Sequence, residues 1–367
     1  MDVREQACWF LLAFESELTT RIVNSILVSW YKDQGRTLDD FFSADAQEWS
    51  ATCHLSPEII AKLEQARDKL VGQVFLAEQL QHERIEMLTV LDAAYPALLK
   101  APLTRSHIPP VLFYAGDLDI LKRQTIAIIG SRNASADSLA FTRAVSQRLA
   151  ADGTNVISGY ARGVDRAAFD GATDSEDGHT TVVLPQGIRT LSGVQMRALQ
   201  PRIEAGQVLL LSQFHPDAPW FMRRAMERNH VVTGLAQVVI VAESGSKGGT
   251  WEGATGALKR GRRVYVRQSR DDQSLAGNQL LLGKGALPLP WPADNLSDTL
   301  SPILQESRAM RERQQKQALQ PDQIALLAWP DAQYFALPPN SRRIIREVSA
   351  SIYRLMDRTS RQLVRTN

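Results

Sequence analysis

The chain has 367 residues, of which 44% are hydrophobic and 22% charged, and its formal net charge is +2. A soluble chain of this length is expected to form two or three domains of about 150 residues each. The small net charge excludes a protein that holds nucleic acid through overall basicity, so any nucleic-acid site must be a local patch.

The cysteines and histidines exclude further classes. The two cysteines, Cys8 and Cys53, form no CxxC pair, which excludes a disulfide framework and a cysteine-built zinc site. No histidine pair has metal-ligand spacing and no G-x-S-x-G elbow is present, so we predict no metal, no cofactor and no hydrolase centre. The apolar run at residues 9–14 is too short for a signal peptide or a membrane span. We therefore expect a cytoplasmic protein without a membrane segment.

Residues 1–75 are predicted to form a small helical domain. Apolar residues recur there at helical spacing, at Leu11, Leu12, Leu18, Ile22, Ile26 and Leu27. Thr37 and Ser56 are predicted helix N-caps, the second followed by Pro57 in the first turn. Residues 76–123 follow as a proline-rich connector, in which residues 111–114 are expected to join the next sheet as a short strand.

Residues 124–295 alternate between strands and helices. Apolar runs predict strands at 125–130, 155–158, 180–184, 208–212, 238–242 and 263–266, with helices between them, for example at 135–151 and 251–259. Continuous apolar strands suit a sheet covered on both faces. We therefore predict an α/β fold with a doubly wound, mostly parallel sheet, whose ligands bind at the carboxyl ends of the strands.

Residues 296–367 are predicted to form a basic helical C-terminal region. One basic cluster contains Arg308, Arg311, Arg313 and Lys316, and a second contains Arg342, Arg343, Arg346, Arg354, Arg358, Arg361 and Arg365. A solvated helix face and an arm for nucleic acid or a protein partner explain this pattern equally well.

The first candidate binding loop is Gly130-Ser131-Arg132, which follows a predicted strand. Glycine permits close approach of a phosphate, and the N-terminus of the following helix favours an anion. Arg132 adds a planar fork that suits phosphate. These residues therefore predict an anion site, although a tight turn between strand and helix has the same pattern.

The second candidate loop contains Ser158, Gly159, Arg162 and Gly163. Its two glycines and its arginine form another potential anion nest. An NAD-binding fold carries an acidic residue at the end of its second strand, where this chain has Ser158 and Gly159. A dinucleotide site is therefore not predicted.

The third candidate loop opens the helix predicted at 251–259. Its glycines and hydrogen-bond donors are Ser244, Gly245, Ser246, Lys247, Gly248 and Thr250. They form a donor-rich cradle, but the spacing of a Walker A loop is missing, which argues against an ATPase. Upstream, Arg228 and Asn229 complete the candidate phosphate-binding residues. Trp220 is expected in the core, and Phe221 either in the core or stacked on a base.

In chain order, these segments resemble the DprA/Smf family of DNA-processing proteins. The matching segments are residues 92–99 (D-x-x-Y-P-x-x-L), 126–132 (first strand and phosphate loop), 158–165 (S-G-x-A-x-G-[IV]-D), 228–229 (the start of R-N-R), 244–246 (S-G-S) and 278–286 (N-x-L-x-x-x-G-A). The chain departs from the family pattern at Phe169, where members carry His, at His230, where they carry Arg, and in its longer third loop.

The resemblance implies a Rossmann-like domain that binds single-stranded DNA, preceded by a SAM-like helical domain. It also implies a homodimer that delivers DNA to a RecA-type recombinase during natural transformation, without enzyme activity. By position, Gly130 and Arg132 are the first candidates for DNA contact and Lys247 is a weaker one.

Two alternatives stay open. Divergent members of this family also act as antitoxins or regulators in phage-defence modules, where the partner would be a cognate toxin. Residues 248–252 also resemble the loop of the lysine decarboxylase-like phosphoribohydrolases, in which Arg228 would bind phosphate and Glu252 would act as acid and base. A helix N-terminus keeps a carboxylate ionised, which disfavours acid catalysis by Glu252.

Overall fold

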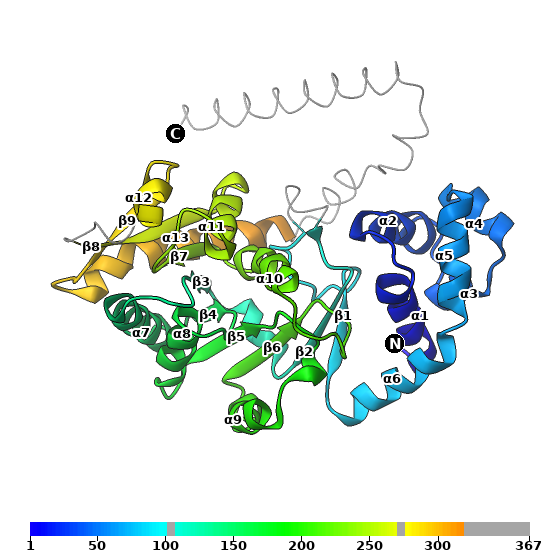
Figure 1. Ribbon diagram of the computed structural model, residues 1–367, viewed down its shortest axis with the longest axis horizontal. Coiled ribbons are helices and arrows are strands. Elements are labelled where there is room, and N and C mark those ends of the chain that lie inside the picture. The colour runs from blue at the N-terminus through cyan, green and yellow to red at the C-terminus, as the bar shows by residue number, and fades with distance from the viewer. Residues whose placement is uncertain (101–106, 270–275, 319–367) are drawn as a thin grey trace, which may run out of the picture.

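The computed structural model describes residues 1–100, 107–269 and 276–318 (Figure 1). Within these residues, a nine-stranded sheet has the order β1-β2-β6-β5-β4-β3-β7-β8-β9. The strands are β1 Glu86–Thr89, β2 Val111–Ala115, β3 Thr125–Ile129, β4 Asn155–Ser158, β5 His179–Val183, β6 Val208–Ser212, β7 Val238–Val241, β8 Arg263–Ser269 and β9 Leu287–Trp291. Neighbouring strands from β6 to β9 are parallel, whereas β1–β2 and β2–β6 are antiparallel. The predicted doubly wound, mostly parallel sheet is confirmed.

Strands β1 and β9 lie outside the predicted set. Strand β1 has only four residues, one of them exposed, and so carries little apolar signal. Strand β9 contains Pro288 and Pro290, which donate no backbone hydrogen bond. Both strands lie at the edges of the sheet, where such sequences are tolerated.

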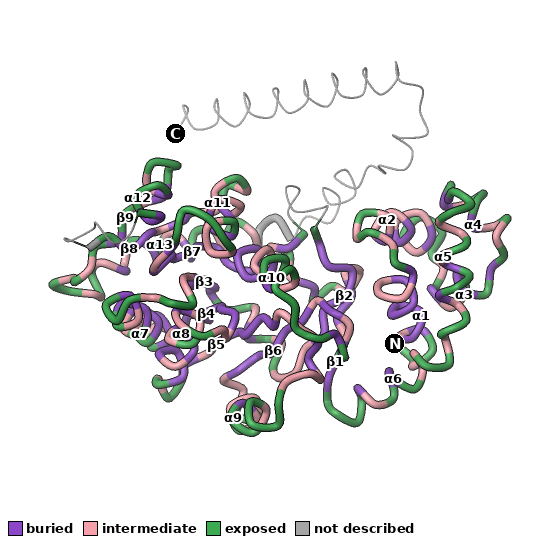
Figure 2. Tube along the Cα trace, viewed as in Figure 1, coloured by how far each residue is buried: buried purple, intermediate pink, exposed green. Residues whose placement is uncertain are grey.

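Helices cover both faces of the sheet because side chains alternate along each strand. The helices in this part are α7 Ala136–Ala151, α8 Val164–Thr173, α9 Gly193–Glu204, α10 Met222–Gly234, α11 Gly249–Lys259, α12 Ala276–Leu282 and α13 Leu296–Ala318. Ile126 and Ile128 of β3 pack with α7, α8 and α13, whereas Ala127 and Ile129 pack with α10 and α11. Figure 2 shows the strands as a buried layer among these helices.

Short helices precede the sheet. They are α1 Val3–Phe10, α2 Thr20–Ile26, α3 Leu38–Ser43, α4 Ala46–Cys53, α5 Pro57–Arg67 and α6 Leu70–His82. Both predicted N-caps are confirmed, since Thr37 caps α3 in a capping box with Asp40 and Ser56 is the N-cap of α5. Helix α6 continues past residue 75, the predicted limit of the helical domain.

The helical region shares a core with the sheet, beside which it lies in Figure 1. Phe113 of β2 is fully buried, and its ring centroid lies 5.5 Å from that of Phe10 and 5.8 Å from that of Phe14. The connector therefore contributes a strand whose side chains join the two parts, and the predicted strand at 111–114 is confirmed.

Helix α13 packs against the sheet, although the predicted domain boundary lies just before it. Leu300 and Ile303 are fully buried, and Gln124 Nε2 donates to the Leu304 carbonyl oxygen at 2.9 Å. The second basic cluster, residues 342–365, lies outside the described residues. Among the helices that the structure describes, none combines the length and apolar character needed to cross a membrane.

Candidate functional site

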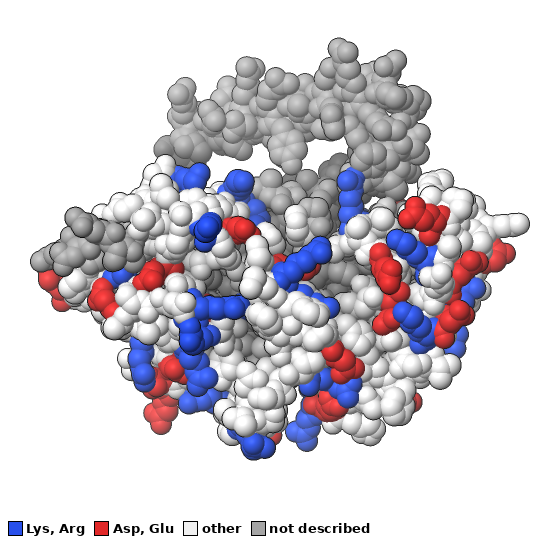
Figure 3. Space-filling model, viewed as in Figure 1, with Lys and Arg blue, Asp and Glu red and all other residues white. Residues whose placement is uncertain are grey.

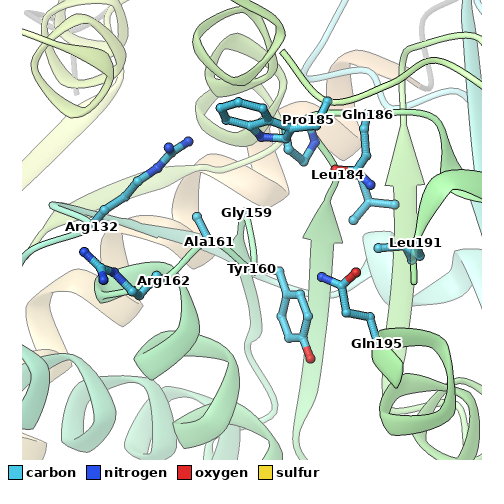
Figure 4. Close-up of a pocket in the computed structure, with 11 residues that line it drawn as sticks. Arg132, Gly159, Tyr160, Ala161, Arg162, Leu184, Pro185, Gln186, Leu191 and Gln195 are labelled. Carbon is cyan, nitrogen blue, oxygen red and sulfur yellow. The ribbon is translucent and has the colours of Figure 1, made fainter. Parts of the chain in front are cut away.

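A pocket of about 460 Å³ opens at the carboxyl ends of β3, β4 and β5 (Figure 4). Its lining consists of Arg132, Gly159, Tyr160, Ala161, Arg162, Leu184, Pro185, Gln186, Leu191, Gln195 and Trp220. No acidic residue belongs to this lining. Ligand pockets commonly measure about 300–1,000 Å³, and in parallel sheets they lie at this edge. The first and second predicted loops therefore meet at one pocket.

One side of the pocket is cationic. Figure 4 shows Arg132 and Arg162 side by side on the wall opposite Gln186 and Gln195. The Arg162 Nη2 donates to Asn133 Oδ1, and neither arginine pairs with a carboxylate among the described residues. On the face shown in Figure 3, basic side chains gather over α8 and α10. This wall can accept an anion without displacing an internal ion pair.

Trp220 is a correction to the sequence analysis, which placed it in the core. Its side chain is 44% exposed and lies over the pocket, because α10 begins only at Met222 and the preceding segment runs along the surface. The Arg132 guanidinium carbon lies 5.6 Å from the Trp220 ring centroid. Phe221 is 55% exposed, which settles its position at the surface as well.

Tyr160 forms part of the neutral side of the pocket. Its φ of 59° is in the left-handed region, which non-glycine residues seldom adopt and which is common at functional sites. The ring packs edge-on against Phe169, with centroids 4.7 Å apart, and the Tyr160 hydroxyl accepts a hydrogen bond from Arg166 Nη1 at 3.0 Å. These contacts hold the ring at the pocket despite the backbone strain.

The glycines of the second loop accommodate protein atoms. A Cβ at Gly159 would overlap the Arg228 guanidinium, and one at Gly163, where φ is 88°, would overlap the backbone carbonyl of Ser131. In the first loop, a Cβ at Gly130 would similarly overlap Val164. Gly130 and Gly163 are thus explained by packing between the two loops and Gly159 by packing against Arg228 of α10, a different reason from the phosphate approach inferred from the sequence.

Arg228 lies beneath the pocket. It is 3% exposed, its Nη1 donates to the Val183 carbonyl oxygen at 2.7 Å, and its Nη2 is 3.6 Å from Asp165 Oδ2. Burial raises the pKa of Asp165 above the usual aspartate range, and the positive charge of Arg228 opposes this rise. Ser158 is also buried, with its hydroxyl donating to the Ile128 carbonyl oxygen at 3.0 Å. Both residues support the loop from below and are absent from the lining.

The N-terminus of α7 already has an acidic neighbour. Glu243 Oε2 accepts hydrogen bonds from the Ser135 backbone N–H at 3.0 Å and from the hydroxyl groups of Ser135 and Ser138 at 2.9 and 2.7 Å. The anion site expected at this helix terminus is therefore occupied by a side chain of the protein. Arg132 and Arg162 remain as the candidate anion-binding groups of the first two loops.

The third loop follows β7, on the other side of β3 from the pocket. Gly245, Ser246, Lys247 and Gly248 are exposed and Thr250 is partly exposed. None of them lines the pocket.

The ends of this loop are anchored to the protein. Ser244 is buried, and its N–H donates to Asn278 Oδ1 at 2.9 Å, whereas Asn229 Nδ2 donates to the Gly249 carbonyl oxygen at 3.1 Å. The loop is a separate, anchored surface beside the topological switch between β3 and β7.

Tyr160, Gln186, Gln195 and Trp220 line the pocket but are absent from the predicted site. Gln186 could have been found from its position just after β5, since parallel strands deliver their following residues to one edge. Gln195 carried no comparable signal, because it lies inside α9.

The two residues of the phosphoribohydrolase alternative are not brought to the pocket. Arg228 is buried beside Asp165, whereas Glu252 is exposed in the first turn of α11 and is no part of the lining. The geometry gives that alternative no support.

Comparison with known proteins gives consistent matches. Residues 86–300, more than half of the chain, match the family model of DNA recombination-mediator protein A. The chain is 31% identical over 253 residues to Protein Smf of Synechocystis, covering 63% of this chain and 62% of that protein. It is 30% identical over 186 residues to DNA processing protein DprA of Streptococcus pneumoniae, covering 51% and 64%. The chain thus spans less than two thirds of the length of these relatives.

Two solved structures are similar. DNA processing protein A from Streptococcus pneumoniae superimposes with a TM-score of 0.62 at 23% identity, covering 79% of this chain and 95% of that chain. At this identity the match shows that the two chains share a fold. The protein of the same name from Helicobacter pylori has a TM-score of 0.51 at 25% identity, covering 61% and 97%. That second structure concerns a single-stranded DNA binding mode.

Proposed function

Because the chain belongs to the DNA recombination-mediator protein A family, we propose that it binds single-stranded DNA in the pocket above β3, β4 and β5. The observation that carries this proposal is that Arg132 and Arg162, from consecutive loops, both line a pocket whose lining contains no acidic residue. The single-stranded DNA bound by the Helicobacter pylori relative supports the same ligand class.

The pocket chemistry suits a sugar–phosphate chain with unpaired bases. Arginine forks bind phosphate oxygens in a planar, bidentate manner. Exposed aromatic side chains such as Trp220 stack on bases of any sequence, with a contribution of about 1–3 kcal/mol per base. Arg132 can contact a phosphate and a base stacked on Trp220 at the same time, since it lies near the Trp220 ring while remaining exposed.

The test is a titration of a labelled oligothymidylate at several salt concentrations, read by fluorescence anisotropy. Arg132→Ala is expected to lower the affinity about tenfold, as for the loss of a charged hydrogen bond. It should also reduce the slope of log affinity against log salt by about 0.7, the value for one phosphate contact on a single strand.

Arg143→Ala is the matched control, because Arg143 is equally charged and exposed but pairs with Asp174 away from the pocket. This control should bind like the wild type. Absence of binding by the wild-type chain, or equal losses in both variants, would overturn the proposal.

The third loop is proposed as a second, weaker contact region, through Gly245, Ser246, Lys247 and Gly248. Their exposure beside the switch point supports this role. Lys247→Ala is expected to change the affinity less than Arg132→Ala, because lysine offers a point charge without the bidentate fork.

We further propose that the chain acts in DNA processing and transfers its DNA to a RecA-type recombinase, as a homodimer. The family description as a recombination mediator supports the recombinase step. Stimulation of recombinase filament formation on DNA, and a dimeric mass in solution, are the corresponding measurements. The antitoxin alternative has no specific structural observation in its favour, since most of the basic C-terminal residues lie outside the described part of the chain.

A further inference from the structure

The neutral wall of the pocket carries a carboxamide whose orientation is fixed. Gln186 Nε2 donates to the Thr190 carbonyl oxygen at 3.1 Å and to the Thr190 hydroxyl oxygen at 2.9 Å. The Thr190 hydroxyl donates its own proton to the Gly187 carbonyl oxygen at 2.7 Å, so it can only accept from Gln186. Rotating the amide would bring two acceptors together. Gln186 therefore presents Oε1 as a free acceptor, with no hydrogen bond to it from any residue that the structure describes.

Gln195 is fixed in the opposite sense. Its Oε1 accepts from the Ser192 backbone N–H and from the Ser192 hydroxyl, each at 3.0 Å, as the third residue of a capping box at α9. The oxygen is thus engaged, and Nε2 is left as a donor without a partner among the described residues. Figure 4 shows this nitrogen on the side of Gln195 that faces Tyr160.

The surfaces around these two amides are apolar. The Tyr160 ring and Leu191 belong to the lining, as does Leu184, which is almost fully buried. Aromatic and aliphatic side chains of this kind suit the flat face of a heterocycle. The lining residues of this wall are uncharged, in contrast with Arg132 and Arg162 on the other side, although Arg166 packs against Tyr160 with its guanidinium carbon 4.8 Å from the ring centroid.

We propose that the neutral wall is a nucleobase subsite, in which Gln186 Oε1 accepts from, and Gln195 Nε2 donates to, the Watson–Crick edge of one base of the bound strand. This inference deepens the proposed function and depends on it. The base lies against Tyr160 and Leu191, while Arg132 and Arg162 hold the adjoining phosphates.

The pair of one acceptor and one donor distinguishes a base from a phosphate. A phosphate diester offers only acceptors, so Gln186 Oε1 would repel it. A base edge offers a donor next to an acceptor, as thymine does with its N3–H and O4. A pocket built for the backbone alone would leave Gln186 Oε1 unpaired against the ligand, which costs binding free energy.

The test compares an oligothymidylate with an oligomer of the same length in which every residue lacks its base. The wild-type protein should bind the oligothymidylate at least about tenfold more tightly, through the base in this subsite together with a base stacked on Trp220, and the variants below isolate the subsite. Gln195→Glu keeps the capping oxygen, since Glu is favoured at this helix position, but replaces the donor by a charged acceptor.

Val194→Glu is the matched control, because Val194 is 69% exposed, adjacent in α9 and absent from the lining. Both variants should lose affinity for the abasic oligomer equally, through charge alone. On oligothymidylate, Gln195→Glu should lose about tenfold more than Val194→Glu.

Each outcome has a separate meaning. Equal wild-type affinity for the two oligomers, or equal losses by the two variants on both, would overturn the base subsite and leave the DNA-binding proposal in place. Failure of the wild-type chain to bind either oligomer would overturn the proposed function and the subsite together.

Discussion

At Gly159, the missing side chain decides where a buried arginine lies. The Arg228 guanidinium fills the space that a Cβ would occupy, and from there it reaches the Val183 carbonyl oxygen and Asp165. Glycine is therefore required at position 159 because Arg228 packs there to form the floor of the pocket, and not only because the loop turns at this point.

Gly159→Ala is expected to lower the free energy of unfolding by about 1–3 kcal/mol, as for an overpacked site, and to weaken DNA binding because the floor moves. Urea denaturation and the anisotropy titration measure the two effects. Gly72→Ala is the control, since no atom lies near its Cβ position and the residue is in α6. That control should stabilise the protein by about 0.5–1 kcal/mol. A Gly159→Ala protein with wild-type stability and affinity would contradict the described contact.

At the residue scale, the sequence identified Arg132 and Arg162 because both follow strand ends, and the fold brings those ends together. The sequence does not indicate that Arg228 is buried. An arginine is buried only where the fold supplies partners, and these partners, Val183 and Asp165, come from separate segments. Spacing alone does not reveal such an arrangement.

At the scale of elements, strand β2 joins the helical region to the sheet. Phe113 of β2 is fully buried against Phe10 of α1, and β2 pairs with β6 of the sheet domain. A short strand within the connector thus carries contacts to both parts.

Phe113→Ala is expected to lower the free energy of unfolding by about 3–5 kcal/mol, because truncation of a buried ring leaves a cavity. Chemical denaturation monitored by tryptophan fluorescence is the measurement. Val71→Ala, at a position that is 82% exposed, should change stability by less than about 0.5 kcal/mol. If Phe113→Ala lowered the free energy of unfolding no more than Val71→Ala, the contact between the helical region and the sheet at Phe113 would not contribute to stability.

The predictable elements were those with strong local patterns. Strands β3 to β8 are apolar runs between helices, and the helix at Thr37 has a complete capping box. Strand β9 was not predictable from its own sequence, because Pro288 and Pro290 disfavour a strand. It forms because β8 offers it a parallel partner. The order of the strands likewise depends on tertiary packing.

At the scale of the whole molecule, three histidines couple stability to pH. Burial is the first cause that lowers the pKa of His179, His215 and His230 below the ordinary histidine value. In the unfolded chain these groups take up protons at about pH 6.5. The folded state takes them up at lower pH, so their contribution to stability is complete above about pH 6.5 and is lost as the pH falls below it.

His230→Gln is expected to reduce this loss, because it removes a ring that Arg260 and His107 also keep neutral. The free energy of unfolding of the variant, relative to the wild type, should therefore be more favourable at acidic than at mildly alkaline pH. Val71→Ala, at an exposed position of α6 without a titratable group, is the control and should give the same difference at both pH values. A pH-independent difference for His230→Gln would contradict the assigned environment.

The antiparallel pairing of β2 with β6 also limits how the chain can be divided. A fragment that began at β3 would leave the backbone donors and acceptors along that side of β6 without a partner strand, and would uncover Val208 and Leu210. An open apolar edge of this kind is a template for self-association. The N-terminal third of the chain therefore protects the edge of β6 from self-association, in addition to any other role.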